Sequence, residues 1–257
     1  MRLDGGMGVA LMAVRAEWTK LRTTPGPAWL LLVTGAVTVA LGAAVSSAAA
    51  CARDGCGIDG VRVALGGVYL GQASVAVLAV LVVSGEYSTG LIRTTFAATP
   101  GRATVLAAKA VVLAVVVAAV GSLAVVGSLL VAGMIGLPRL SVVDGPMLRA
   151  AGGSVVYLVL IAVLGLGAGV VVRDSAAAIG AVLGVLYLPP ILGTMVADPH
   201  LHRLLERGAP MSAGLSVQAT TDLRQLAIGP WAGLGVLAVW SGGALLAGVL
   251  LLRSRDT

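Results

Sequence analysis

The charged residues divide this chain into long stretches that contain no Asp, Glu, Lys or Arg. Six stretches have at least 23 residues, and the next longest, residues 208–221, has only 14. A helix that crosses a bilayer needs about 20 apolar residues to cover roughly 30 Å of hydrocarbon. The pattern therefore predicts six membrane-spanning helices. The six stretches are residues 23–52, 63–85, 110–138, 150–172, 175–197 and 225–252.

Composition points to the same class of protein. Of the 257 residues, 58% are hydrophobic and only 11% are charged, whereas soluble domains carry roughly 25% charged residues. We therefore expect an all-α integral membrane protein and exclude a soluble enzyme, a secreted domain and an outer-membrane barrel. The whole chain, 1–257, forms one transmembrane domain. Its spans are expected near residues 28–50, 64–84, 110–133, 150–172, 175–197 and 231–252.

The distribution of Lys and Arg predicts the orientation. Six spans place both termini on one side, and that side carries ten Lys and Arg residues against seven on the other. The positive-inside rule then puts residues 1–27 and 85–109 in the cytoplasm and residues 198–230 outside. We expect a multi-pass protein of the plasma membrane. The net charge of +6 fits a cytoplasmic rim beside anionic lipid, with no nucleic-acid partner.

The sequence lacks the residues that several kinds of chemistry require. Neither lysine, Lys20 or Lys109, precedes Ser or Thr, so the chain has no phosphate-binding loop of an ATPase. No expected span contains Asp, Glu, Lys, Arg or His, which argues against a proton- or sodium-coupled secondary transporter. His200 and His202 lie in a polar loop without a metalloprotease motif. We therefore expect no catalytic residues, no metal and no cofactor in this chain.

Two cysteines lie between the first two spans. Cys51 and Cys56 enclose a short segment, Ala-Arg-Asp-Gly, in a loop expected to be external. Disulfides persist outside the cell, so the two residues form either a disulfide or a pair of free thiols. Without further Cys or nearby His residues, a zinc site is not expected.

The segment before the first span has the pattern of an amphipathic helix. Apolar residues recur at the spacing of one helical stripe, and polar residues, Glu17 and Lys20 among them, lie on other faces. The stripe consists of Leu11, Val14, Trp18 and Leu21. Such a helix is expected to lie in the membrane interface, either as a passive anchor or beside a partner.

The cytoplasmic loop 85–109 contains more apolar residues than a solvated connector needs. Leu91, Ile92 and Phe96 could share one face of a short helix, which Gly90 and Pro100 would delimit. Lipid or a partner protein should cover that face. Arg93 and Arg102 keep the loop on the positive side of the membrane.

These segments resemble the permease subunits of ATP-binding-cassette transporters of the type-2 exporter class. The resemblance covers nearly the whole chain and has three specific parts. The strongest is Gly85-Glu86-Tyr87-Ser88-Thr89-Gly90-Leu91-Ile92-Arg93-Thr94-Thr95, followed by Ala98-Thr99-Pro100, Arg102 and Lys109-Ala110. The others are Glu17 with Lys20-Leu21-Arg22-Thr23-Thr24, and Pro230-Trp231-Ala232-Gly233-Leu234.

The resemblance implies roles for both cytoplasmic segments. The N-terminal helix would lie at the interface, and the loop would hold a coupling helix that docks on a separate P-loop ATPase. The loop residues concerned are Glu86, Tyr87, Gly90, Leu91, Ile92, Arg93, Phe96, Pro100 and Arg102. ATP and Mg²⁺ would bind the partner, and two permease copies or paralogues would form the efflux path. The alternatives are a non-transport membrane sensor or assembly component and a secondary transporter.

Overall fold

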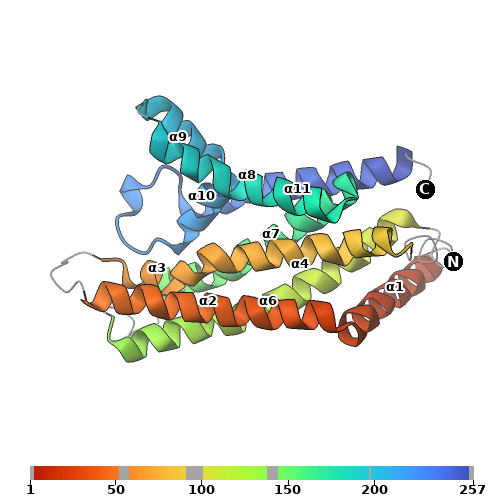
Figure 1. Cartoon of the computed structure of the whole chain (residues 1–257), viewed down its shortest axis with the longest axis horizontal. Coiled ribbons are helices and arrows are strands. Elements are labelled where there is room, and N and C mark those ends of the chain that lie inside the picture. The colour runs from red at the N-terminus through yellow and green to blue at the C-terminus, as the bar shows by residue number, and fades with distance from the viewer. Residues whose placement is uncertain (1–2, 52–57, 91–100, 138–143, 197, 255–257) are drawn as a thin grey trace.

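The computed structural model describes residues 3–51, 58–90, 101–137, 144–196 and 198–254, and these residues form helices and no strands (Figure 1). The long helices are α1 (Leu3–Thr23), α2 (Pro25–Cys51), α4 (Val68–Ser88), α6 (Arg102–Ile135), α7 (Gly145–Val172), α8 (Ser175–Met195) and α11 (Pro230–Ser254). The shorter ones are α3 (Gly60–Ala64), η1 (Leu65–Gly67), α9 (Pro199–Gly208), α10 (Pro210–Leu215), η2 (Ser216–Gln218) and η3 (Leu223–Gln225).

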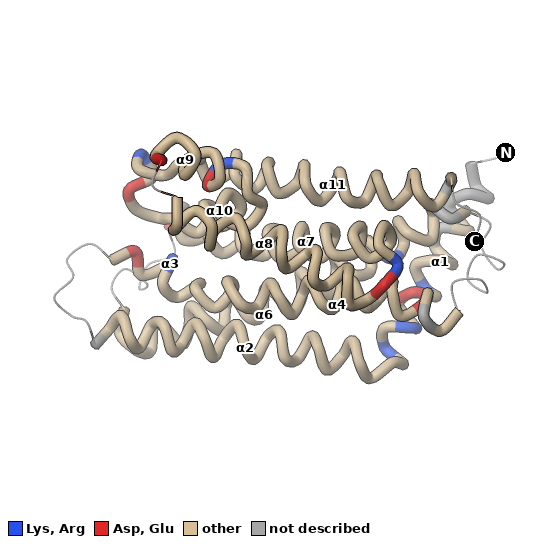
Figure 2. Tube along the Cα trace, turned by 45° about the horizontal axis from the view of Figure 1, so that its top comes forward, with Lys and Arg blue, Asp and Glu red and all other residues tan. Residues whose placement is uncertain are grey.

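Six helical segments are long and apolar enough to cross a membrane, as the sequence predicts. They are α2, the continuous segment α3–η1–α4, α6, α7, α8 and α11. The molecule is therefore a multi-pass helical membrane protein. Both termini lie at the same end of the bundle, which we call the terminal end (Figure 1). In the described part of the chain, charged residues gather toward the two ends and leave the middle almost free of them (Figure 2).

Helix α6 is longer than a bilayer requires. Its 34 residues extend about 51 Å at 1.5 Å per residue, against roughly 30 Å of hydrocarbon. The helix begins at Arg102, whereas the expected span begins at residue 110. The additional turns place Lys109 inside the helical bundle at the terminal end.

Helix α7 forms the centre of the bundle and packs against α4, α6, α8 and α11. Tyr157, Ile161 and Leu166 on this helix are fully buried. The glycines Gly165 and Gly169 face α4, where a Cβ on Gly165 would lie 2.9 Å from the Cβ of Ala79. This spacing of small residues therefore serves close packing of α7 against α4 within the subunit.

The part of the second span that lies farther from the termini crosses α2 at unusually short range (Figure 1). A Cβ at Gly67 would lie 1.8 Å from the carbonyl oxygen of Thr38, so only glycine fits at this position. The residue belongs to η1, the 3₁₀ turn that joins α3 to α4. This contact fixes α4 directly against α2.

Aspartates begin several of the helices. The carboxylates of Asp144, Asp174 and Asp198 accept hydrogen bonds from the backbone N–H groups two or three residues later, as N-caps do. Helix α8 contains two consecutive prolines, Pro189 and Pro190, and continues through both to Met195. A helix can continue where neighbouring elements satisfy the freed carbonyl groups.

The segment between α8 and α11 is only partly the polar loop that its composition suggests. Helix α9 is polar and has no buried residue, but α10 and η2 are mostly buried, with Met211 and Val217 at 0% exposure. The carboxylate of Asp59, the N-cap of α3, accepts hydrogen bonds of 2.6 Å from both the N–H and the hydroxyl of Thr220. This segment therefore packs into the bundle at the end opposite the termini.

Candidate functional site

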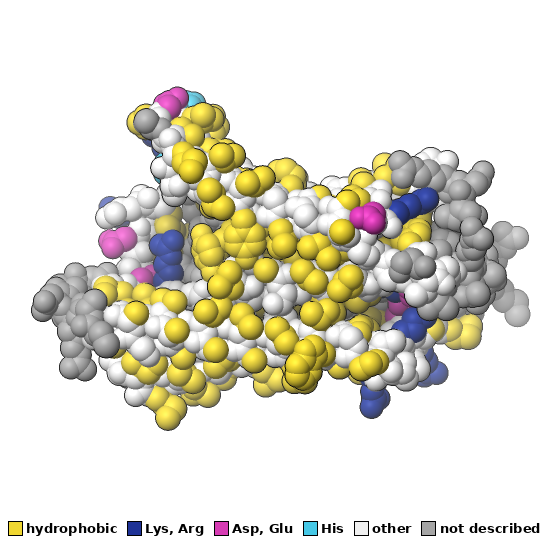
Figure 3. All heavy atoms as spheres, viewed as in Figure 1, with side chains coloured by type: hydrophobic (Ala, Val, Ile, Leu, Met, Phe, Trp, Pro, Cys, Tyr) yellow, Lys and Arg dark blue, Asp and Glu magenta, His cyan; other side chains and the backbone are white. Residues whose placement is uncertain are grey.

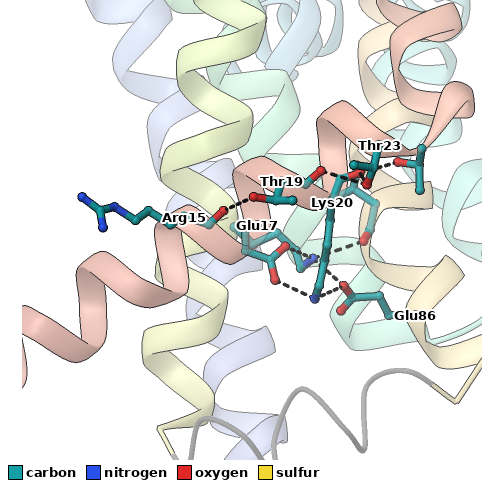
Figure 4. Close-up of polar contacts among 9 residues, drawn as sticks. Arg15, Glu17, Thr19, Lys20, Thr23 and Glu86 are labelled. Carbon is teal, nitrogen blue, oxygen red and sulfur yellow. Dashed lines mark hydrogen bonds and ion pairs between the residues drawn. The ribbon is translucent and has the colours of Figure 1, made fainter.

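Four charged side chains meet at the terminal end of the bundle, and we call them the four-charge cluster. They are Glu17 and Lys20 of α1, Glu86 of α4 and Lys109 of α6. Figure 4 shows Glu17, Lys20 and Glu86 converging from two helices. The cluster therefore connects three elements that lie far apart in the sequence.

Each ammonium group contacts both carboxylates. Lys20 Nζ lies 2.9 Å from Glu17 Oε1 and 2.9 Å from Glu86 Oε1. Lys109 Nζ lies 2.5 Å from Glu17 Oε2 and 3.0 Å from Glu86 Oε1. It also donates to the carbonyl oxygen of Val82 at 3.4 Å. The arrangement is a closed ring of four ion pairs with no net charge.

The ring forms because of where its members lie on their helices. Glu17 and Lys20 are three residues apart and so share one face of α1. Glu86 lies in the last turn of α4, and Lys109 lies about two turns into α6. The ammonium group of lysine is a compact charge that can contact two carboxylates at once, which suits this site better than a planar guanidinium.

Burial makes the cluster energetically important. Glu17, Glu86 and Lys109 are only 4%, 7% and 4% exposed. Isolated charges at such positions cost several kcal/mol each, so they are tolerated only when paired. Lys20 is partly exposed. Burial lowers its pKa, but hydrogen bonds to Glu86 and Glu17 outweigh that effect and raise the pKa above its ordinary value. Lys20 therefore remains charged at physiological pH.

The end of α4 is also held by the turn between α7 and α8. The guanidinium of Arg173, in the turn between α7 and α8, lies 5.3 Å from the centre of the Tyr87 ring. Arg173 has a φ of 62°, the left-handed conformation that lets α7 end and α8 begin within two residues. Ser175 donates a hydrogen bond of 2.8 Å to Ser84. Cation–π and hydroxyl contacts thus join this turn to α4.

The structure brings together only some of the residues singled out in the sequence. Glu86 and Tyr87 lie at the site, and Gly90 has a φ of +71°, which suits glycine. Five predicted coupling residues and Cys56 lie outside the described residues, as do the side chains of Arg102 and Cys51. The five are Leu91, Ile92, Arg93, Phe96 and Pro100. The disulfide and the coupling helix therefore stay predictions.

Helix α1 packs on the bundle through a different face from the apolar stripe. Glu17 and Ala13 are buried, whereas Leu11 is 56% and Trp18 42% exposed. Val14 and Leu21 are partly exposed. The face toward the protein is thus the one that carries Glu17, and the stripe of Leu11 and Trp18 points away from the bundle.

From the sequence, Lys20 is assigned to a polar face of the N-terminal helix, and both lysines belong to the segments that resemble type-2 permeases, but neither is paired with a carboxylate. One signal could have found the cluster: the chain has fifteen Arg but only two Lys, and both lysines belong to it. In the described part of the chain, no group of three or more His, Cys, Asp or Glu residues could hold a metal ion. The four-charge cluster provides an electrostatic connection between α1, α4 and α6.

Comparison with known proteins adds no relative to this picture. No protein-family model matches the sequence, and no curated protein matches it.

Proposed function

We propose that this chain is the permease subunit of an ATP-driven exporter of the type-2 ATP-binding-cassette class. The observation that carries the proposal is the four-charge cluster. It joins the N-terminal helix α1 to the end of α4 and the beginning of α6, which are the two helices that flank residues 91–100. A force on that segment would reach α1, α4 and α6 together.

In this proposal, residues 86–102 form a coupling element that docks on a separate P-loop ATPase. ATP and Mg²⁺ bind that partner. Closure of the ATPase pushes on the segment, and the four-charge cluster transmits the displacement to the spans. The termini and the cluster face the cytoplasm, α9 and α10 face outward, and α1 lies in the membrane interface. Two such subunits form the path for an amphiphilic or hydrophobic substrate.

The packing of α1 supports this assignment. Its buried face carries two members of the cluster, and its exposed face carries Leu11 and Trp18. An apolar stripe with Trp at the membrane–water boundary suits a helix that lies in the interface. In this proposal the helix would respond both to the membrane and to the cytoplasmic partner.

The test is affinity purification of the tagged chain from its native membrane in mild detergent, followed by mass spectrometry. We expect a stoichiometric P-loop ATPase with the wild-type chain and its loss with Arg93→Glu or Phe96→Asp. The matched control is Arg203→Glu, the same charge reversal on exposed helix α9 at the opposite end. Recovery of the intact chain without an ATPase would contradict the proposal and favour a non-transport membrane component.

A further inference from the structure

The end of the molecule opposite the termini contains a cavity of mixed polarity. Its volume is about 290 Å³, at the lower end of the range of small-molecule sites. Residues of α3, α4, α8, α9, α10 and the segment before α11 line it. Figure 3 shows apolar side chains over the middle of one face and, below α9, a recess that contains Lys or Arg side chains. Unlike the apolar surface of the spans, this cavity offers charged groups to a ligand.

Hydrogen bonds between the surrounding elements fix the walls of the cavity. Helix α9 is joined to α8, where Nδ1 of His202 lies 2.9 Å from the carbonyl oxygen of Gly193. The same helix is joined to the segment before α11 by Arg207, whose Nε donates to the carbonyl oxygen of Ala227 at 2.7 Å. The hydroxyl of Tyr187 joins α8 to α4, because it donates to a carbonyl oxygen of α4 at 2.6 Å. The cavity is therefore built into the fold.

One wall of the cavity presents two hydrogen-bond acceptors side by side. A carbonyl oxygen can only accept, so the contact with Gly193 places a proton on Nδ1 of His202. In the neutral imidazole, Nε2 is then an acceptor, and it lies 3.4 Å from Oε1 of Glu206, which also accepts. A second proton on the ring or an N–H donor from a ligand would complete this wall. A ligand with an ammonium group suits it, because the ammonium group can donate to both atoms and pairs with the carboxylate charge.

A cation lies on another wall of the same cavity. The guanidinium of Arg62, on α3, forms no hydrogen bond or ion pair with any other described residue. A guanidinium binds carboxylate or phosphate oxygens through two parallel hydrogen bonds. Glu206 lines the cavity as well, but no ion pair joins it to Arg62. The cavity therefore holds two opposite charges that do not neutralise each other.

A ligand that complements both walls carries a negative and a positive group at once. Pro189, Leu205 and Ile228 add apolar surface to the lining. We propose that this cavity binds a compact zwitterion with an apolar portion. The anionic group of the ligand pairs with Arg62, and its ammonium group donates to Glu206 and to His202. This site does not depend on the transport function proposed above.

The probe is free leucine, a zwitterion with an apolar side chain. Two relatives each lack one of its charges: isocaproate has no ammonium group, and isoamylamine has no carboxylate. Binding of radiolabelled leucine is measured on the purified chain in phosphatidylglycerol nanodiscs at about pH 8, where histidine side chains are ordinarily neutral. We expect saturable binding that either relative displaces about tenfold less effectively than unlabelled leucine. Absence of saturable binding, or equal displacement by either relative, would overturn the proposal.

Substitutions connect the binding to the cavity. Arg62→Gln removes the partner of the carboxylate, and Glu206→Gln removes the charge that pairs with the ammonium group. Each should weaken leucine binding about tenfold. The matched control is Arg224→Gln, which changes an exposed arginine at the same end that does not line the cavity. Wild-type affinity in Arg62→Gln, or an equal loss in Arg224→Gln, would overturn the proposal.

The same assay in phosphatidylethanolamine nanodiscs identifies the source of the zwitterion. Weaker leucine binding there assigns the site to a zwitterionic lipid headgroup, and unchanged binding assigns it to a free solute.

Discussion

Replacing Lys109 by methionine removes one positive charge from the four-charge cluster and keeps most of the apolar stem of the side chain. Two buried carboxylates then share a single ammonium group, that of Lys20. Glu17 Oε2 loses its ion pair with Lys109, and Glu86 keeps one of its two. The cluster changes from neutral to a net charge of −1 in a site where Glu17 is 4% exposed.

The expected loss of stability follows from opposing electrostatic effects. Two unit charges 3.0 Å apart attract by about 5 kcal/mol at an effective dielectric constant of about 20. Taking the ions out of water offsets much of this attraction. Removing one partner of a buried pair nevertheless leaves an uncompensated charge and costs about 3–5 kcal/mol. We therefore expect the unfolding midpoint of Lys109→Met to fall by about 10 °C.

The assay is thermal unfolding in detergent, followed by the fluorescence of the four tryptophans. Adding Glu17→Gln to Lys109→Met restores neutrality and should recover about 2 kcal/mol, which a double-mutant cycle measures as coupling. Arg203→Met, on exposed helix α9, is the control and should change stability by less than about 0.5 kcal/mol. A wild-type midpoint for Lys109→Met, or strictly additive effects of the two substitutions, would refute the reasoning.

Two further outcomes test the rest of the fold. The Asp59 carboxylate is partly buried, which raises its pKa, but hydrogen bonds from Thr220 and from neighbouring backbone N–H groups outweigh this and hold the pKa below its ordinary value. The Asp59 carboxylate contributes fully to stability when the pH is above the ordinary pKa of an aspartate. This contribution is lost as the pH falls through the lower pKa that Asp59 has in the folded protein. Below about pH 4 the wild-type midpoint should therefore fall more steeply than that of Asp59→Asn, and parallel profiles would contradict this role. Gly67→Ala should greatly reduce folded protein in the membrane because its Cβ would lie 1.8 Å from the Thr38 carbonyl oxygen, whereas Gly85→Ala, which meets no atom within 4 Å, should not; equal yields would contradict the close packing of α2 and α4.

The spans could be predicted from the sequence because the physical constraint on them is local. A bilayer excludes unpaired charge over about 20 residues, so charge-free stretches alone identify six helices. Their ends were less predictable, since a helix that pairs its charges internally can extend past a charged residue. Lys109 shows this, because α6 begins seven residues before it, at Arg102.

The candidate site was harder to predict because its members are neighbours only in three dimensions. Glu17 and Lys109 are separated by 92 positions. Helical periodicity alone assigns Glu17 to a polar face of α1, and only the packing against α4 and α6 shows that this face is buried. The packing of α10 against the bundle could not be predicted for the same reason. Tertiary contacts bury Met211, although the segment between α8 and α11 has a polar composition.

The measurement that tests the central claim most directly is the rate of ATP hydrolysis by the chain and its co-purified ATPase in proteoliposomes. The comparison is between wild type, Lys109→Met and Arg203→Met, below the unfolding midpoint of each variant. The account holds that the four-charge cluster transmits the displacement of residues 91–100. It then predicts that the wild-type chain and Arg203→Met each change the rate of ATP hydrolysis several-fold relative to the ATPase alone. Lys109→Met then loses most of that effect while the ATPase stays bound. A Lys109→Met complex with the wild-type rate would contradict the claim.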